Sequence, residues 1–117
     1  MIRILLVLLA LGSPAQALET IQGQTAVLRG LDRISGAVGD LEISAGQSGT
    51  YGRLTIEVGE CRVPRANPSG DAYSFLTIRY DGIDEPVFEG WMIASSPALN
   101  AFDHHRYDVW LLRCTTS

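Results

Sequence analysis

The chain has 117 residues, with 9 basic against 13 acidic side chains and a net charge of −4. This length fits a single domain, and the acidic balance argues against nucleic acid or anionic lipid as a partner, because both repel a negative surface. No lysine occurs in the chain, which excludes Schiff-base chemistry, a Ser-Lys nucleophile pair and a P-loop.

The first 17 residues have the layout of a secretory signal peptide. Arg3 precedes an apolar run over residues 4–11, and the following GSPAQA breaks that run and supplies the small-x-small pattern that signal peptidase accepts. The apolar run is far shorter than the ~20 residues of a membrane-spanning helix. We therefore expect a cleaved signal peptide at residues 1–17, one β-rich domain over residues 18–117, and export to the periplasm with no membrane-spanning segment left.

The remaining chain alternates short apolar runs with Gly, Asp, Pro and Ser, which is the spacing of an all-β domain. Residues 25–31 read as a first strand, and residues 37–44 carry a second, weaker one. Residues 45–52, AGQSGTYG, read as a Gly- and Ser-rich connection. This part of the chain therefore predicts two strands and a loop.

A third strand, at residues 53–63, carries a break in its alternation. Apolar residues occupy one face up to Val58, and beyond Gly59 the apolar positions have the opposite parity. One extra residue near Gly59-Glu60, a β-bulge, would return Cys61 to the core face.

Three more strands complete the predicted sheets. Residues 72–80 and 86–93 form two of them, and residues 106–114 form the last. In the last strand, strict alternation places Trp110 and Cys114 on the same side, which predicts that Trp110 lies in the core. We expect an all-β fold of six to seven antiparallel strands, arranged as a sandwich or a small barrel.

The two cysteines, Cys61 and Cys114, both follow the predicted signal peptide. An even number of cysteines in an oxidising compartment favours a disulfide. With two cysteines only one pairing exists, and a bridge that closes so long a loop contributes roughly 4 kcal/mol in the loop-entropy model. We predict a disulfide between Cys61 and Cys114.

Residues 94–105, ASSPALNAFDHH, connect the last two predicted strands. Ser96 before Pro97 has the form of a helix N-cap followed by proline at the first helical position. We expect one short helical turn near residues 97–102, which plugs one end of the β domain, with Ser95 and Ser96 as capping residues.

A serine-hydrolase interpretation of this segment takes Ser95 or Ser96 as nucleophile, His104 as base, and Asp103 or Asp108 as the group that orients it. The sequence lacks a Gly-x-Ser-x-Gly elbow, and a capping hydroxyl is already committed to backbone amides. We therefore expect no catalytic residues and a non-enzymatic protein.

A metal interpretation uses His104 or His105 with a neighbouring aspartate. Adjacent histidines in an extended chain point to opposite faces, and no second cluster completes a set of ligands. We expect no metal site and no cofactor. The possible functional surface consists of the exposed chemistry-bearing residues of this region: Trp91, Ser95, Ser96, His104, His105 and Asp108.

Three segments together resemble one known family. VLRGLDRISG, YGRLTIEVGECR and FEGWMIASSPALNAFDHHRYDVWLLRC are similar to domain of unknown function family 2155, a group of small exported alphaproteobacterial proteins. The likeness covers about residues 25–114. Ser35 stands where we expect threonine, and His105 stands where proline usually follows the histidine. The second departure weakens any role for a rigid His-Pro joint.

The resemblance implies an exported β-rich domain and transfers no catalytic residues. We expect a protein that binds or supports an unidentified partner protein of the cell envelope. The family's genes often neighbour one for an accessory or assembly factor of respiratory NADH dehydrogenase, so the resemblance also implies an alternative, an accessory subunit or assembly factor of a respiratory membrane complex. A small hydrolase or metal-dependent enzyme using the Ser95–Asp108 segment is the remaining alternative.

Overall fold

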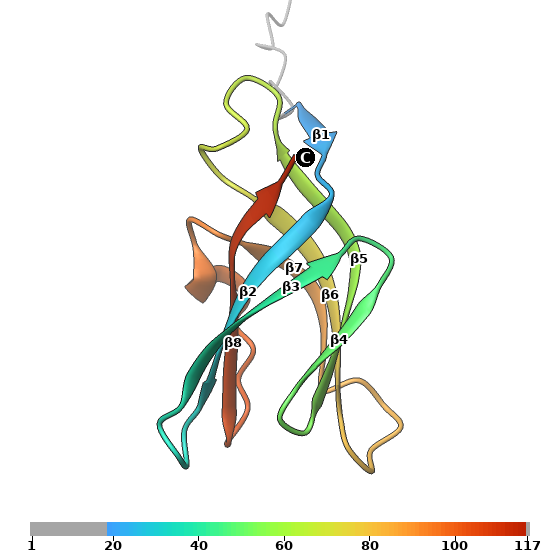
Figure 1. The fold of residues 1–117 in the computed structure, drawn as a ribbon, viewed down its shortest axis with the longest axis vertical. Helices are drawn as coiled ribbons and strands as arrows, with labels where there is room; N and C mark the ends of the chain where they lie inside the picture. Colours follow the sequence, from blue (N-terminus) through green and yellow to red (C-terminus); the bar gives the residue numbers. More distant parts are fainter. Residues whose placement is uncertain (1–18, 117) are drawn as a thin grey trace, which may run out of the picture.

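The computed structural model describes residues 19–116, which form two antiparallel β-sheets and one short 3-10 helix (Figure 1). The elements in chain order are β1 (Thr20–Gln22), β2 (Thr25–Asp32), β3 (Val38–Ser44), β4 (Ser48–Tyr51), β5 (Leu54–Pro64), β6 (Tyr73–Tyr80), β7 (Phe88–Ile93), η1 (Pro97–Asn100) and β8 (Tyr107–Thr115). One sheet has the order β1-β5-β6-β7, with β4 also paired to β5, and the other has the order β3-β2-β8.

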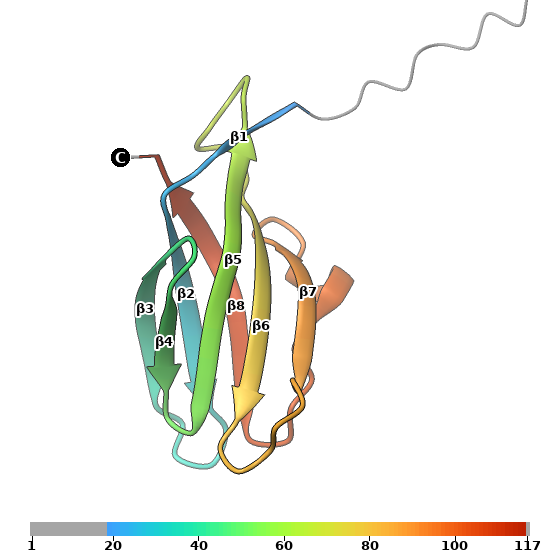
Figure 2. The same cartoon turned by 90° about the vertical axis from the view of Figure 1, so that its right-hand side faces the viewer.

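The two sheets pack face to face and do not close into a barrel (Figure 2). The predicted all-β architecture is therefore confirmed as a sandwich, and its core consists of apolar side chains from the inner faces of both sheets. The signal peptide predicted at residues 1–17 lies outside the described residues. Within residues 19–116, no helix is long and apolar enough to cross a membrane.

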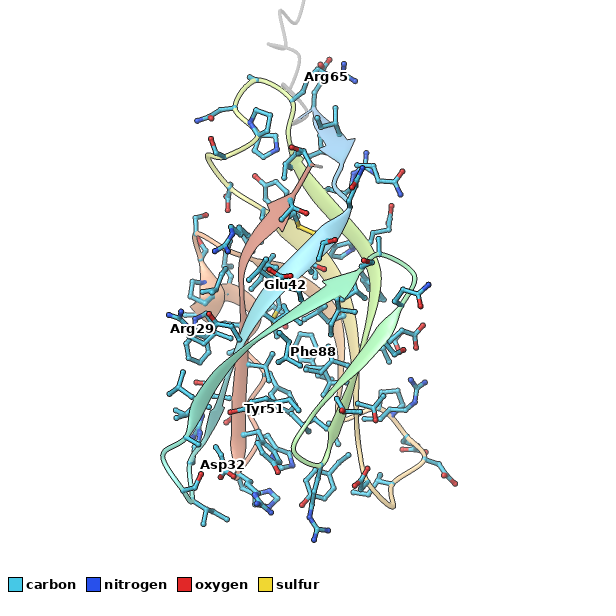
Figure 3. The ribbon with its side chains drawn as sticks, in the orientation of Figure 1. Arg29, Asp32, Glu42, Tyr51, Arg65 and Phe88 are labelled. Atoms are coloured by element: carbon cyan, nitrogen blue, oxygen red, sulfur yellow. A yellow bond between two sulfur atoms is a disulfide. The ribbon has the colours of Figure 1, made fainter. Side chains whose placement is uncertain are left out.

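All six strands that the sequence predicts are present, and two short ones, β1 and β4, were not predicted. β4 lies inside the segment read as a connection, since its residues are small or polar and show no apolar alternation. It forms because it pairs with β5, and because Tyr51 at its end packs between the sheets (Figure 3).

Tyr51 depends on two glycines in the facing sheet. Gly30 of β2 and Gly39 of β3 are register partners, and the Tyr51 ring lies directly against both. A Cβ atom at Gly30 would approach the ring to 2.7 Å, and the nearest contact at Gly39 would be 3.3 Å. The Tyr51 ring also meets Tyr107 edge to face, with centroids 6.0 Å apart. The missing side chains at the glycine pair therefore create the space that the tyrosine fills.

A disulfide joins Cys61 of β5 to Cys114 of β8, the pair that the sequence predicts, with the two Cα atoms 5.9 Å apart. It crosses the core from one sheet to the other (Figure 3). The predicted bulge near Gly59 is present as a register shift between Val58 and Glu60, and it leaves Cys61 fully buried.

A second bulge, in β8, was not predicted. The β2–β8 register shifts where Leu28 pairs with Leu111 while the preceding residue of β2, Val27, pairs with Arg113, so Leu112 is the extra residue. The placement of Trp110 in the core is therefore wrong. Leu111 points inward before the bulge, Cys114 points inward after it, and Trp110 lies half-buried on the outer face.

The contact between Gly30 and Tyr51 predicts that the stability lost on substituting Gly30 depends on whether the tyrosine ring is present. Gly30→Ala should destabilise the protein by about 1–3 kcal/mol, because the added Cβ collides with the Tyr51 ring and overpacks the core. In a Tyr51→Leu background the same change should cost clearly less, since the ring is absent. Urea denaturation of the four proteins measures both values, and an equal cost in the two backgrounds would contradict the contact.

The disulfide predicts a loss of stability on its removal. The double variant Cys61→Ser with Cys114→Ser should lose about 2–5 kcal/mol of unfolding free energy, as is typical for a native bridge in a small secreted domain. Non-reducing mass spectrometry of the unaltered protein should show a mass lower than that of the reduced form by two hydrogen atoms. Two free thiols under those conditions would refute the bridge.

Candidate functional site

The connection from β7 to β8 carries most of the residues that the sequence singled out. η1 lies beside β7 at the edge of the sandwich (Figure 2), and all four of its residues are exposed. It is shorter than the predicted turn over residues 97–102. Ser96 occupies the N-cap position before Pro97 but makes no side-chain capping bond. Instead, the Asn100 side-chain amide holds η1 by donating to the Trp91 carbonyl at 3.1 Å.

Ser95 is bound to a carboxylate from a distant loop. Its hydroxyl donates to Asp71 Oδ2 at 2.7 Å, and its backbone N–H donates to Asp71 Oδ1 at 3.0 Å. The Ala72 N–H donates to the same Oδ1 at 2.8 Å. Partial burial pushes the pKa of Asp71 upward, but these hydrogen bonds outweigh it, so its pKa lies below the ordinary value. Ser95 therefore anchors the end of β7 to the β5–β6 loop.

Asp71 is the anchoring residue that sequence reasoning missed. It belongs to the polar stretch 64–71, where one aspartate resembles the other loop residues. Its place immediately before a strand was the only local sign of a structural role. The partner, Ser95, lies 24 positions later, and only the pairing of β6 with β7 brings the two segments together.

His104 closes one end of the core as a neutral ring. It stacks on Phe102, with centroids 5.5 Å apart, and on Tyr80 at 5.1 Å. Its Nδ1 accepts hydrogen bonds from the backbone N–H groups of Arg106 at 3.1 Å and Tyr107 at 3.3 Å. The acceptor nitrogen is thus occupied, and the proton of the neutral ring sits on Nε2.

Burial lowers the pKa of His104 below the ordinary value, and the nearby His105 and Arg33 lower it further. His105 itself is exposed, with its ring tilted against that of His104 at a centroid distance of 4.2 Å. Asp108 forms an ion pair with Arg33, at 3.8 Å between the charged atoms. No histidine takes part in that pair.

The structure does not assemble the residues of the hydrolase interpretation. Ser95 bonds to Asp71, His104 bonds to backbone amides, and Asp108 pairs with Arg33. Within the part of the chain that the structure describes, no three His, Cys, Asp or Glu side chains gather where they could hold a metal ion. The arrangement supports structural roles for these polar groups.

An aromatic surface lies on the outer face of the sheet that contains β6 and β7. We define the β6–β7 aromatic patch as Tyr73, Phe75, Trp91 and Ile93, which are cross-strand neighbours in the register Tyr73↔Ile93 and Phe75↔Trp91. Trp91 packs edge to face on Phe75, with centroids 5.7 Å apart, and is 39% exposed. Sequence reasoning found Trp91 only, because part of the β6 segment is apolar on both faces and its alternation does not show which side chains face outward.

Two hollows lie along β8. The larger, of about 640 Å³, opens between the loop at residues 68–71, residues 94–95 just after β7, and residues 112–116. The smaller, of about 330 Å³, separates η1 and Phe102 from residues 108–110. Ser95 and Asp71 line the first hollow, and Asp108 lines the second. Three of the residues considered for catalysis or anchoring thus border recessed surface.

Comparison with known proteins identifies relatives without an assigned activity. The model of a family described as "Uncharacterized protein conserved in bacteria (DUF2155)" matches residues 26–114. An uncharacterized protein of Rickettsia prowazekii (strain Madrid E) is 30% identical over 88 residues, which are 72% of this chain and 56% of that relative. The chain therefore spans little more than half the length of this relative. No solved structure matches the chain.

The lowered pKa of His104 predicts that the folded protein loses stability as the pH falls, at pH values above the range in which carboxylates titrate. The unfolded histidine takes up a proton near pH 6.5, whereas the folded one resists protonation to a lower pH. Its contribution to stability is therefore complete above about pH 6.5 and falls as the pH drops below that value. Between pH 7.5 and pH 5.5, the urea midpoint of unfolding should fall less for His104→Gln than for the unaltered protein.

His105→Gln is the matched control, because it removes the neighbouring exposed imidazole. It should retain most of the pH dependence of the unaltered protein. If His104→Gln shows the same loss of stability between pH 7.5 and pH 5.5 as the unaltered protein, the assignment to His104 fails.

Proposed function

Because this chain belongs to the bacterial family DUF2155, whose description assigns no activity, we propose its function from its own surface. The protein is a non-enzymatic domain of the periplasm that binds or supports a protein partner of the cell envelope. The contact surface is the β6–β7 aromatic patch. The observation that carries this proposal is Trp91, a large side chain that is 39% exposed beside a second aromatic ring.

The patch has the composition of a protein interface. Aromatic residues are enriched at such interfaces, where an apolar centre is surrounded by a polar rim. Here Glu60 lies across from Phe75 in the register, and Glu89 precedes Trp91 by two positions on the same face. Both glutamates are exposed. Glu60 forms an ion pair with Arg62, which lies across from Tyr73 in the register, so the rim of the patch is polar and carries charges of both signs.

Two features of the chain support the remaining parts of the proposal. Export is supported by the signal-peptide pattern of the first 17 residues and by the Cys61–Cys114 disulfide, because such bridges persist in oxidising compartments. A non-enzymatic role is supported by the separate hydrogen-bond partners of Ser95 and His104, since nucleophilic catalysis needs such groups within reach of each other.

Crosslinking in the periplasm followed by affinity purification tests the proposal. The tagged protein should capture a specific partner, and Trp91→Ala should reduce the captured amount about tenfold or more, because buried tryptophans dominate binding energy at interfaces. Leu99→Ala is the control, since Leu99 is 73% exposed on η1, outside the patch. It should leave capture unchanged.

Two outcomes would reject this function. The first is that the unaltered protein captures nothing beyond background, and the second is that a folded Trp91→Ala variant captures the same partner equally well. The identity of the captured partner also decides the alternative role, since subunits of a respiratory membrane complex would place the protein among its accessory or assembly factors.

A further inference from the structure

Side chains alone hold the middle of the β7–β8 connection to the sandwich. At one end, the Ser96 N–H donates to the Ile93 carbonyl, and at the other, the Arg106 carbonyl accepts from the Arg33 N–H. Between these two points, residues 97–105 make no backbone–backbone hydrogen bond to a strand among the described residues. Segments with so few backbone bonds open locally at a lower free energy than the sheets do.

Three side chains tether residues 97–105. The Asn100 amide donates to the Trp91 carbonyl at 3.1 Å. Phe102 is 2% exposed and meets Phe88 of β7 edge to face, with centroids 6.1 Å apart. His104 accepts hydrogen bonds from two backbone N–H groups at the start of β8. Only the His104 tether contains a group that titrates near neutral pH.

Protonation of His104 removes its tether. The neutral ring carries its proton on Nε2, so an added proton binds Nδ1, the atom that accepts from the N–H groups of Arg106 and Tyr107. A protonated Nδ1 accepts no hydrogen bond, and its own N–H then faces two other donors. Both backbone amides lose their acceptor, which costs free energy for as long as the ring keeps this position.

The groups around the His104 ring do not compensate the added charge. Among the described residues, no hydrogen bond joins this ring to a carboxylate, and Asp32 and Asp108 pair instead with Arg106 and Arg33. The ring itself stacks on uncharged aromatic rings. The titratable and charged groups of the surrounding elements are Asp103, His105 and Arg106 of the connection, Tyr107 and Asp108 of β8, Tyr80 of β6, Asp32 at the end of β2, and Arg33 in the turn that follows it.

We propose that residues 97–105 are a pH-operated segment, which protonation of His104 releases from the sandwich while both sheets stay folded. The sheets stay folded because their strand pairings and the Cys61–Cys114 bridge involve none of these residues. The release is a property of this chain alone and does not depend on the partner proposed for the β6–β7 aromatic patch.

Release of the segment changes what the protein exposes. Phe102 leaves the core, where it is now almost fully covered. The Trp91 carbonyl loses the donor that Asn100 provides, on β7, which is the last strand in the order β1-β5-β6-β7. An apolar side chain and an open strand edge, two features that favour contact with another protein, thus become accessible in acid.

The titration of histidine sets the size of the effect. Burial, and then the neighbouring His105 and Arg33, hold the pKa of His104 below its ordinary value while the segment is closed. In the released segment the ring titrates near the ordinary value of about 6.5. Opening therefore increases as the pH falls below about 6.5, and it increases up to about tenfold between pH 7.5 and pH 5.5.

Amide hydrogen exchange of the unaltered protein, followed by NMR at these two pH values, tests the release. After correction for the intrinsic pH dependence of exchange, the Arg106 and Tyr107 amides should open up to about tenfold more often at pH 5.5. Low urea concentrations should barely change this opening, because a local opening exposes little surface. The Leu76 and Ile78 amides of β6, a strand paired on both sides, should stay far more protected and respond to urea.

Three variants separate the tethers. His104→Asn places a side-chain oxygen at the position of Nδ1 and does not titrate, so it should keep both amides protected and abolish the pH dependence. His105→Gln is the matched control and should retain that dependence. Asn100→Ala removes a tether that does not titrate, so it should increase the opening by the same factor at both pH values.

Four outcomes would overturn the release. The first is that the Arg106 and Tyr107 amides exchange with the same free energy and urea dependence as the β6 amides, since acid would then act on global unfolding only. The second is an opening that does not change between pH 7.5 and pH 5.5, and the third is a change that persists in His104→Asn. The fourth is an Asn100→Ala variant with unaltered opening, because residues 97–105 would then not move as one unit.

Discussion

The disulfide between Cys61 and Cys114 constrains the end of the sandwich where β5 and β8 end, because among residues 19–116 it is the one side-chain crosslink that is covalent between the two sheets. Each cysteine reaches the core only through a bulge: Gly59 is the extra residue in β5, and Leu112 is the extra residue in β8. The bridge thus holds together two strands that are each irregular at that level. It also fixes β8 beside the larger hollow, which Cys114 itself lines.

The two bulges show how far sequence reasoning reaches. At Gly59 the alternation visibly changes parity next to a glycine, so the bulge could be predicted. At Leu112 the apolar residues on both sides leave no visible change of parity, and Trp110 was consequently assigned to the wrong face. β4 was missed for a related reason, since its stability comes from pairing with β5 and from the glycines opposite Tyr51. Such tertiary contacts override local propensity.

The candidate site was predictable in its location but not in its bonding. The sequence singled out the segment that carries Ser95, His104 and Asp108. Ser95 borders the larger hollow, Asp108 borders the smaller one, and His104 lies at one end of the core. The partners of these residues come from elsewhere in the chain: Asp71 binds Ser95, and Arg33 pairs with Asp108. Spacing within one segment cannot reveal such partners. Spacing therefore suggested a catalytic triad, whereas each of its members bonds to a different partner.

The end of β7 connects the aromatic patch to the larger hollow. Ile93 belongs to the aromatic patch, and the next two residues, Ala94 and Ser95, line the larger hollow. Asp71 holds this turn through both the hydroxyl and the amide of Ser95. Loss of the Asp71 carboxylate leaves Ser95 without its partner and loosens this turn. Ser95, which the sequence offered as a nucleophile, thus serves with Asp71 to support the turn beside the aromatic patch.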